Sequence, residues 1–283
     1  MSWQIPPEFE RRALAALQEA TAAVLEVYGR DDFGIQYKDE KEPVTRADLA
    51  ANEVLEKRLT ALLPEAGWLS EESGRDLISL ANKEMLWVVD PIDGTREFID
   101  RNGQFAISVG LVRKGRPVWG AVSLPAEPRI VMSGDRGVRC YDMQGAISDW
   151  IRPLQGPGPS LPECKICVSR TEWTRGVFDS QKGDLNIVPE GSVARKMALV
   201  AAGDFDLTVS LYPKNDWDIA GGMALILAAG GTILRPDTAE SIGLHPPGQR
   251  RPGPCCGHSE GVMEYHRYFQ SMGLRLRQKY GDA

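Results

Sequence analysis

The stretch "WVVDPIDGTREF", residues 87–98, places two aspartates directly after an apolar run. Residues 87–89 are apolar, Asp90 follows at once, and Asp93 comes three residues later. The proline between the two acids restricts φ, and Gly94 permits backbone conformations that other residues resist. The pattern predicts a buried strand that ends at Asp90 in a stiff turn. Both carboxylates would then lie at the carboxyl end of the strand, where α/β proteins commonly carry their sites.

The residues after this turn predict an anion site beside the carboxylates. Thr95 is expected to cap a short helix from Arg96 to about Arg101, which Asn102 and Gly103 close. The free N–H groups at the start of that helix would face the two acids. Carboxylates next to an anion site need cations between them, because crowded unpaired acids repel one another and their pKa values rise. Mg²⁺ suits such a site, since it takes oxygen ligands and binds phosphate as well.

Three further acids stand at defined places in the predicted elements. Glu71 follows a short strand in "WLSEES" (68–73), and Asp218 begins a helix in "NDWDIAGG" (215–222) that is apolar on nearly every side. Asp48 lies in the first turn of another predicted helix. Taken singly, such acids cap helices or line solvated turns. Their coexistence with the two acids described above favours one shared acidic site.

Composition limits the class of protein and its partners. The chain has 283 residues, 42% of them apolar and 25% charged, which is enough for one large domain or two lobes. A net charge of −6 excludes a nucleic-acid polymer as the expected partner. The N-terminus lacks a signal-peptide pattern, and no apolar run approaches the ~20 residues of a membrane span. We therefore expect a cytoplasmic protein without a membrane partner, in which the five cysteines stay reduced.

The first half of the chain reads as an α+β lobe. Helices are expected at 8–28 and 45–63, the second with Thr45 as its N-cap and Asp48 completing a capping box. Short strands follow, with "RKGRP" (113–117) as a hairpin turn between two of them, so the sheet should be largely antiparallel. These strands are predicted at 67–69, 86–89, 105–112, 117–124 and 130–133.

A proline- and glycine-rich segment at 153–162 is the predicted lobe boundary. It divides the chain into an N-terminal lobe, 1–155, with most of the acids, and a C-terminal α/β lobe, 156–283, with the last acid and the substrate side. In the second lobe, strands are expected at 164–170, 205–211 and 232–234. Helices are expected at 192–202, stopped by Gly203, and at 218–229. Cys164 and Cys167 resemble half a zinc site by spacing, but a strand would send them to opposite faces.

Four segments together resemble the inositol monophosphatase superfamily of Mg²⁺-dependent phosphomonoesterases. They are "VTRAD" (44–48), "SEES" (70–73), "DPIDGT" (90–95) and "WDIAGG" (217–222), and their order and separations match from about residue 38 to 231. The resemblance implies an α/β, or α+β, fold: a layered α-β-α-β-α sandwich of two lobes. It also implies two or three Mg²⁺ ions, a small phosphorylated metabolite as the partner, and sensitivity to lithium. The number of ions bound at once is left open, as is a homodimer.

The resemblance also implies roles for individual residues. The metal ligands would be the side chains of Glu71, Asp90, Asp93 and Asp218 and the carbonyl of Ile92. Asp48 and Thr95 would orient and deprotonate the attacking water, with Glu71 as the third catalytic residue. The phosphate would lie on the backbone of Asp93, Gly94 and Thr95. The remaining substrate-side residues would be Ser169, Arg170, Gly191, Ser192 and Lys214. In relatives the loop before "PVTxAD" closes near the metals, so Lys38 is expected to approach the site.

Local similarity favours one branch of the superfamily. "PVTRADLAAN" (43–52), "EFIDRNGQFAISVGLV" (97–112) and "VSRTEW" (168–173) resemble the bisphosphate nucleotidases, which convert 3′-phosphoadenosine 5′-phosphate to AMP. Arg170, Arg195, Lys196 and Lys214 would offer positive charge for a second phosphate.

The inositol-binding acid of the monophosphatases gives a second argument for that branch. It lies seven residues before the metal-binding Asp of "WD", a count that lands here on Leu211, although Glu190 or Asp216 could take its place. An apolar residue cannot accept hydrogen bonds from a polyol. The alternatives are an inositol-1-monophosphatase or a histidinol-phosphatase of the same superfamily. An alternative from another class is a regulator that binds a phosphorylated ligand without turnover.

Overall fold

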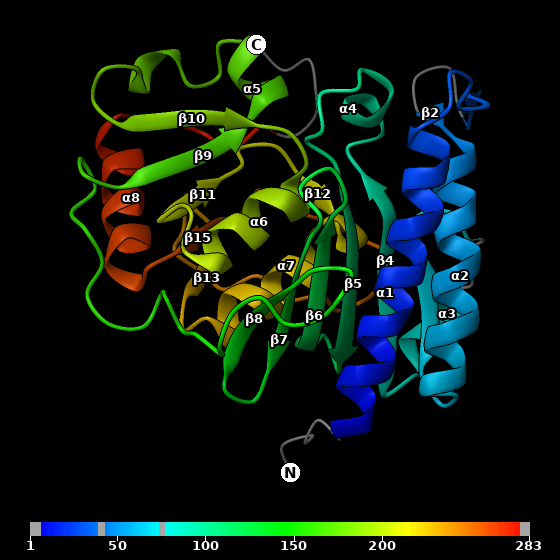
Figure 1. The fold of residues 1–283 in the computed structure, drawn as a ribbon. Helices are drawn as coiled ribbons and strands as arrows, with labels where there is room; N and C mark the ends of the chain where they lie inside the picture. The colour runs from blue at the N-terminus through cyan, green and yellow to red at the C-terminus, as the bar shows by residue number, and fades with distance from the viewer. Residues whose placement is uncertain (1–6, 39–42, 74–76, 278–283) are drawn as a thin grey trace.

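The computed structural model describes residues 7–38, 43–73 and 77–277, which form five layers in the order α-β-α-β-α (Figure 1). The outer layer at the right of Figure 1 is the helix pair α1 (Pro7–Tyr28) and α2 (Arg46–Leu62). A six-stranded sheet follows, then the central helices α6 (Val193–Ala202) and α7 (Asp216–Ala228). A five-stranded sheet and the outer helix α8 (Ser259–Ser271) complete the sandwich. The layered fold predicted from the sequence is confirmed.

The first two layers are held together by the apolar faces of α1 and α2. Small and branched residues of both helices, among them Ala13, Leu17 and Leu55, pack in one buried cluster with Trp87 and Trp119 of the sheet. Burial of apolar surface is the main stabilising contribution in such a layer. The helices predicted at 8–28 and 45–63 are thus confirmed to within one residue at each end.

The six-stranded sheet has the order β3-β4-β5-β6-β7-β8, and only the β3–β4 pair in it is parallel. The predicted antiparallel character and the hairpin turn are confirmed, since Arg113 of β5 pairs with Arg116 of β6. The last strand of the sheet was not predicted. The strands are β3 (Gly67–Ser70), β4 (Met85–Asp93), β5 (Ala106–Arg113), β6 (Arg116–Leu124), β7 (Arg129–Gly134) and β8 (Gly137–Tyr141).

Helix α7 lies directly on the backbone of the six-stranded sheet. A Cβ atom added to Gly120 of β6 would lie 2.4 Å from the carbonyl oxygen of Gly221 in α7, and one added to Gly110 of β5 would lie 2.8 Å from Ala220. Only glycine permits so close an approach of helix and strand. The helix is buried on nearly every side, as predicted, and this contact fixes the position of its first turn.

The five-stranded sheet has the order β10-β9-β11-β15-β13 and mixes parallel and antiparallel pairs. Cys167 lies in the core that faces α6 and α7, whereas Cys164 lies in the core under α8, which confirms the predicted opposite faces. All five cysteines are free and buried. The strands are β9 (Lys165–Ser169), β10 (Asn186–Glu190), β11 (Leu207–Val209), β13 (Thr232–Leu234) and β15 (Cys255–Gly257).

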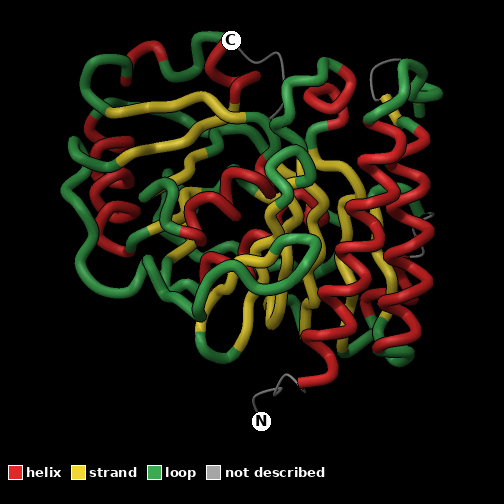
Figure 2. The backbone as a smooth tube through the Cα atoms, viewed as in Figure 1, coloured by secondary structure: helices red, strands yellow, loops and turns green. Residues whose placement is uncertain are grey.

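Short elements complete the described chain, and Figure 2 shows the loops between the elements in green. They are β1 (Gln36–Tyr37), β2 (Pro43–Val44), α3 (Leu77–Ala81), α4 (Thr95–Ile99), α5 (Arg170–Thr174), a 3₁₀ turn (Asp179–Gln181), β12 (Lys214–Asn215) and β14 (Arg250–Arg251).

The lobe boundary near residue 155 stays a prediction. Residues from both sides of it, such as Val88 and Leu225, pack in one core. Within the described ranges no helix has both the length and the apolar character that crossing a membrane requires. Location in the cytoplasm stays a prediction as well.

Candidate active site

Parallel pairing of β3 with β4 brings Glu71 and Asp90 side by side. Ser70 pairs with Val89 in the ladder; Glu71 directly follows the end of β3, and Asp90 is the next residue of β4. The Glu71 N–H donates to the Val89 carbonyl over 3.2 Å, and the charge of Glu71 contributes, after burial, to raising the pKa of Asp90. Two acids from sequence positions nineteen apart therefore meet at the same edge of the sheet.

A β-bulge, not a turn, separates Asp90 from Asp93. Strand β4 was predicted to end at Asp90, and this was wrong, because the strand continues to Asp93. Asp90 pairs with Ser108 and Asp93 with Ala106, so three residue steps on β4 oppose two on β5. Strict alternation would send positions three apart to opposite faces, and one extra residue removes that mismatch. The two carboxylates accordingly act on each other: the charge of Asp93 contributes to raising the pKa of Asp90.

Gly94 and Thr95 turn the chain away from the strand into α4. Gly94 has φ of +96° and occupies the N-cap position, so Thr95 is the first residue of the helix. The prediction that Thr95 caps the helix was therefore wrong. Its hydroxyl instead donates over long distances to the Ile92 carbonyl, at 3.3 Å, and to Asp48 Oδ1, at 3.4 Å. The bulge and the left-handed glycine together aim this hydroxyl at the acid of another helix.

Asp48 serves the helix cap and the site with different oxygens. Its Oδ2 accepts hydrogen bonds from the N–H and the hydroxyl of Thr45, at 2.7 and 2.6 Å, which confirms the predicted capping box. Its Oδ1 faces Thr95. The side chain is buried, and burial raises the pKa of Asp48 to about 7 against the opposing effect of the two Thr45 hydrogen bonds. A carboxyl that titrates near neutral pH can exchange a proton there.

Asp218 lies in the first turn of α7, two residues after the helix begins at Asp216. The predicted start at residue 218 was thus two residues late. Asn215 caps the helix, and its N–H donates to Asp218 Oδ2 over 2.7 Å. Burial, followed by the charge of Asp93, raises the pKa of Asp218 to about 8. The capping contact fixes the orientation of this carboxylate toward the strand acids.

Asp93 joins the strand to the start of α6. Its Oδ2 accepts 2.6 Å hydrogen bonds from the Ser192 hydroxyl and from the N–H of Ala194. Ser192, a predicted substrate-side residue with φ of +50°, is the N-cap of that helix. Sequence reasoning missed Ala194, because a backbone donor leaves no signal in residue type. The neighbouring Lys196 is buried and donates to the Ser192 carbonyl over 2.6 Å.

The acids of the cluster repel one another. Burial and neighbouring acids raise the pKa of Asp90 well above its ordinary value, and burial raises the pKa of Glu71. Asp90 Oδ1 is buried and has no hydrogen-bond partner in the described part of the chain. The Lys38 ammonium lies 3.3 Å from Glu71 Oε1 and also contacts Glu72, which confirms that Lys38 approaches the site. The positive charge of Lys38 thus lies next to the negative charge of the cluster.

The donor set fits a divalent cation of the Mg²⁺ type, which takes carboxylate and carbonyl oxygens. As the side chains lie, no group of three or more acidic, histidine or cysteine side chains among the described residues is arranged to hold a metal ion. Asp93 and Asp218 each turn one oxygen toward a backbone N–H. The metal-ligand roles of these acids and of the Ile92 carbonyl therefore stay predictions.

The substrate-side residues predicted from the sequence fall into two groups. Gln104 Oε1 accepts hydrogen bonds from Arg170 and, over 2.6 Å, from the N–H of Gly191, so it joins these two predicted residues. Ser169 caps α5. Sequence reasoning missed Gln104, because a glutamine in a loop has no characteristic pattern.

Lys214 forms the second group with Glu172, a residue that was also missed. The two side chains are buried and form an ion pair with a 3.0 Å contact. Glu172 also accepts from the N–H of Leu211 over 2.8 Å. Because a buried charge left unpaired is strongly unfavourable, this pair is part of the structure that supports α7. A role for Lys214 in substrate binding stays a prediction.

The two acids that could replace Leu211, Asp216 and Glu190, both have carboxylates that accept hydrogen bonds from other residues. Asp216 is 1% exposed, and its two oxygens accept from Arg251, at 2.6 Å, and from the N–H of Gly248, at 2.7 Å. Glu190 accepts from Arg195 over 3.1 Å. Leu211 itself is buried. These contacts are consistent with the residue count, which places Leu211 and not an acid at the position of the inositol-binding acid.

Comparison with known proteins gives consistent matches in sequence and structure. The sequence model of the inositol monophosphatase family matches residues 7–252. The 3′(2′),5′-bisphosphate nucleotidase CysQ of Escherichia coli K12 is 31% identical over 217 residues, 76% of this chain and 86% of that protein. The suhB protein of Bartonella henselae has a TM-score of 0.76 and 21% identity, covering 91% of this chain and 96% of that one. CysQ of Bacteroides thetaiotaomicron has a TM-score of 0.68 and 26% identity, covering 88% and 96%.

Proposed function

The chain belongs to the inositol monophosphatase family and is a phosphoric monoester hydrolase, and from this premise we propose that it removes the 3′-phosphate of 3′-phosphoadenosine 5′-phosphate in a Mg²⁺-dependent reaction. One observation carries the proposal: strand ends and helix starts gather Glu71, Asp90, Asp93 and Asp218 into a partly buried acidic cluster beside Asp48 and Thr95. Such a cluster requires cations, and cations allow an otherwise acidic site to bind a phosphate ester.

Each residue of the site has a definite task in this account. Mg²⁺ held by these acids would supply positive charge that offsets the charge on the phosphoryl group. Asp48, whose pKa is about 7, takes a proton from the attacking water, and the Thr95 hydroxyl orients that water through its contact with Asp48. The backbone of Asp93, Gly94 and Thr95 holds the phosphate oxygens. The capping contact from Asn215 keeps Asp218 aimed at the cluster.

Charge on the substrate side supports a bisphosphate. Of the four basic residues considered, Arg195 is engaged by Glu190 and Glu127, Lys196 is buried, and Lys214 is paired with Glu172. Arg170 binds the neutral side-chain oxygen of Gln104, which leaves the guanidinium charge uncompensated by that contact. We assign the second phosphate to Arg170, because guanidinium groups bind phosphate bidentately.

Two further observations favour the nucleotidase branch over the alternatives. The position that an inositol-binding acid would occupy is the buried Leu211, and the neighbouring acids are engaged. Relatives at 30–31% identity bear the name 3′(2′),5′-bisphosphate nucleotidase. Inositol 1-phosphate and histidinol phosphate remain the competing substrates. A non-catalytic phospholigand-binding regulator is disfavoured, because every acid that the reaction needs is present. Lithium sensitivity, a homodimer and the number of ions stay predictions.

The assignment of Arg170 is tested by comparing a bisphosphate with a matched monophosphate. Arg170→Gln should raise KM for 3′-phosphoadenosine 5′-phosphate about tenfold, ~1.4 kcal/mol, and change KM for 3′-AMP by less than about twofold. Arg116→Gln, an exposed arginine on β6, is the control and should behave as the wild type. Equal increases in KM for both substrates would show that Arg170 does not contact the second phosphate.

A further inference from the structure

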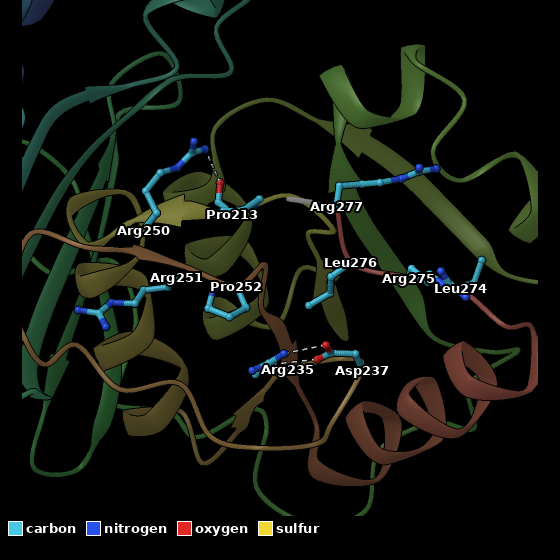
Figure 3. A pocket seen from close by; sticks show the side chains of 10 residues that line it. All are labelled: Pro213, Arg235, Asp237, Arg250, Arg251, Pro252, Leu274, Arg275, Leu276 and Arg277. Atoms are coloured by element: carbon cyan, nitrogen blue, oxygen red, sulfur yellow. Dashed lines mark hydrogen bonds and ion pairs between the residues drawn. The ribbon is translucent and has the colours of Figure 1, made fainter. Parts of the chain in front are cut away.

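A cavity whose lining includes none of the acids of the cluster is rich in arginine. It encloses about 540 Å³, within the range of small-molecule sites. It is lined from three parts of the chain: the β12–β14 strand pair, the segment after β13 and the segment after α8 (Figure 3). Its basic lining residues are Arg235, Arg250, Arg251, Arg275 and Arg277.

The arginines give this cavity an excess of positive charge on an acidic protein. Among the described residues, Asp237 is the one acid in the lining; it pairs with Arg235 over 2.7 Å, and Glu240 outside the lining lies 3.6 Å from the same guanidinium. Arg251 pairs with Asp216, which is buried and lies outside the lining. Arg250 donates to the neutral Pro213 carbonyl over 3.2 Å, so this contact leaves its charge in place. The chain as a whole carries −6, so the positive charge of this lining is a local feature that favours anions.

The remaining lining is apolar and flat. Pro213, Pro252, Leu274 and Leu276 contribute side chains between the arginines, and Figure 3 shows the Leu276 and Pro252 side chains directed toward the space between the arginine-bearing segments. Guanidinium groups match phosphoryl oxygens in bidentate geometry, whereas proline and leucine side chains pack against a flat ring. The combination suits a ligand with an organic ring system and phosphoryl groups, not a bare inorganic anion.

We propose that this cavity is a binding site for a nucleotide-like organic phosphate with at least two phosphoryl charges, separate from the catalytic site. The lining also connects to the acidic cluster. In the β12–β14 ladder, Arg251 pairs with Lys214 and Arg250 with Asn215, the residue whose N–H orients Asp218. Asp216 in the first turn of α7 holds Arg251. A ligand that draws on Arg250 and Arg251 therefore acts on the strand that fixes Asp218, and its binding should alter catalysis.

Binding is tested by calorimetric titration of the full chain with ADP and with pyrophosphate in buffer containing EDTA. Without divalent cations the acidic cluster repels both probes, so binding reports on the arginine cavity. ADP should bind, and Arg250→Gln/Arg275→Gln should weaken its Kd at least about tenfold. Both side chains are exposed, so folding should be preserved. The matched control is Arg267→Gln, an exposed arginine of α8 outside the lining, and its Kd should match the wild type.

Two binding results would overturn the proposal. The first is the same ADP affinity in the double variant as in the wild type, or no binding up to about 1 mM. The second is pyrophosphate binding as tightly as ADP, which would show that the adenosine part of ADP contributes nothing to binding.

The expected effect of the ligand on catalysis rests on the proposed function, and a separate kinetic measurement tests it. ADP should change the Mg²⁺-dependent rate on 3′-phosphoadenosine 5′-phosphate in the wild type and in Arg267→Gln but not in the double variant. The same effect of ADP in all three proteins would place its action at the catalytic site and refute the coupling. If none of the proteins hydrolyses this substrate, the proposed function fails, while the titration still decides whether the cavity binds nucleotide.

Discussion

At the scale of single residues, Thr95 shows how a structural and a catalytic interpretation can be separated. The sequence favours a helix-capping threonine, but Gly94 occupies the cap and the Thr95 hydroxyl points to Asp48 and to the Ile92 carbonyl. The side chain therefore contributes little to the stability of α4. We therefore propose that its hydroxyl acts in catalysis.

Substitution of Thr95 should accordingly affect turnover far more than stability. Thr95→Ala should lower kcat about a hundredfold or more, as removal of a positioning group in general acid–base catalysis does. It should cost less stability than the ~1 kcal/mol typical of a lost cap. Thr95→Ser keeps the hydroxyl and should retain much of the activity. Similar small losses in both variants, measured by steady-state kinetics and thermal unfolding, would leave the hydroxyl without a catalytic role.

The carboxyl groups of the cluster also make the stability of the metal-free protein depend on pH. The pKa of Asp48 is about 7 and that of Asp218 about 8 in the folded chain, against 3.8 ordinarily, and burial is the main cause of both shifts. At a pH between 3.8 and these raised values, the two groups bind more protons in the folded protein than in the unfolded chain. The contribution of these two groups to stability is therefore fully present below about pH 4 and is lost as the pH rises toward 8.

In EDTA, the melting temperature should fall as the pH is raised from about 5 to about 8.5. Asp90→Asn removes one repelling acid and should make this fall smaller, whereas Asp31→Asn, an exposed aspartate, should leave it unchanged. Saturating Mg²⁺ should also reduce the fall, because a ligand that binds only the folded state stabilises it. A melting temperature that is constant or rises over this range would show that the acids do not repel one another.

At the scale of secondary-structure elements, regular spacing of apolar residues made the long helices predictable, and elements too short to show such spacing were not predicted. The amphipathic helices α1 and α2 follow from their apolar spacing, and α2 from its capping box. The outer helix α8 was not predicted, although its buried Val262, Tyr265 and Phe269 follow helical spacing. The paired strands β12 and β14 have two residues each, too few for any period.

The bulge in β4 was beyond sequence reasoning for a different reason. The pattern from Asp90 to Gly94 fits a turn or a bulge equally well, and pairing with β5 decides between them. Both arrangements bring Asp90 and Asp93 together, so these two acids meet although the predicted local backbone was wrong. Their roles as metal ligands stay predictions. Gln104 and Glu172 depend on contacts between distant segments, which no local pattern encodes.

The close contact between α7 and β6 offers a test of how elements position the site. Gly120→Ala would place a Cβ 2.4 Å from the Gly221 carbonyl and push α7 away from the sheet. It should destabilise the fold by about 1–3 kcal/mol and, because Asp218 moves with α7, raise the Mg²⁺ concentration needed for half-maximal activity. Gly243→Ala, where the added Cβ meets open space, is the control. Equal effects of both substitutions on unfolding and Mg²⁺ dependence would refute this positioning.

At the scale of the whole molecule, the layers explain why the site lies where it does. Glu71 directly follows β3, and the other acids come from β4, α2 and α7, so all of them belong to the first three layers of the sandwich (Figure 1). The resemblance of four short motifs to a known superfamily was enough to predict this layered fold. The substrate side was less predictable, because its residues come from loops and strand ends of the second sheet.

The central claim is that this molecule is a Mg²⁺-dependent phosphatase selective for a nucleotide bisphosphate. The most direct test is phosphate release from 3′-phosphoadenosine 5′-phosphate, inositol 1-phosphate and histidinol phosphate, each with Mg²⁺ and with EDTA. We expect kcat/KM for the bisphosphate to exceed that for inositol 1-phosphate at least about tenfold, ~1.4 kcal/mol, and EDTA to abolish all turnover. Equal or faster turnover of inositol 1-phosphate or histidinol phosphate would contradict the substrate assignment, and full activity in EDTA would contradict the role given to the acids.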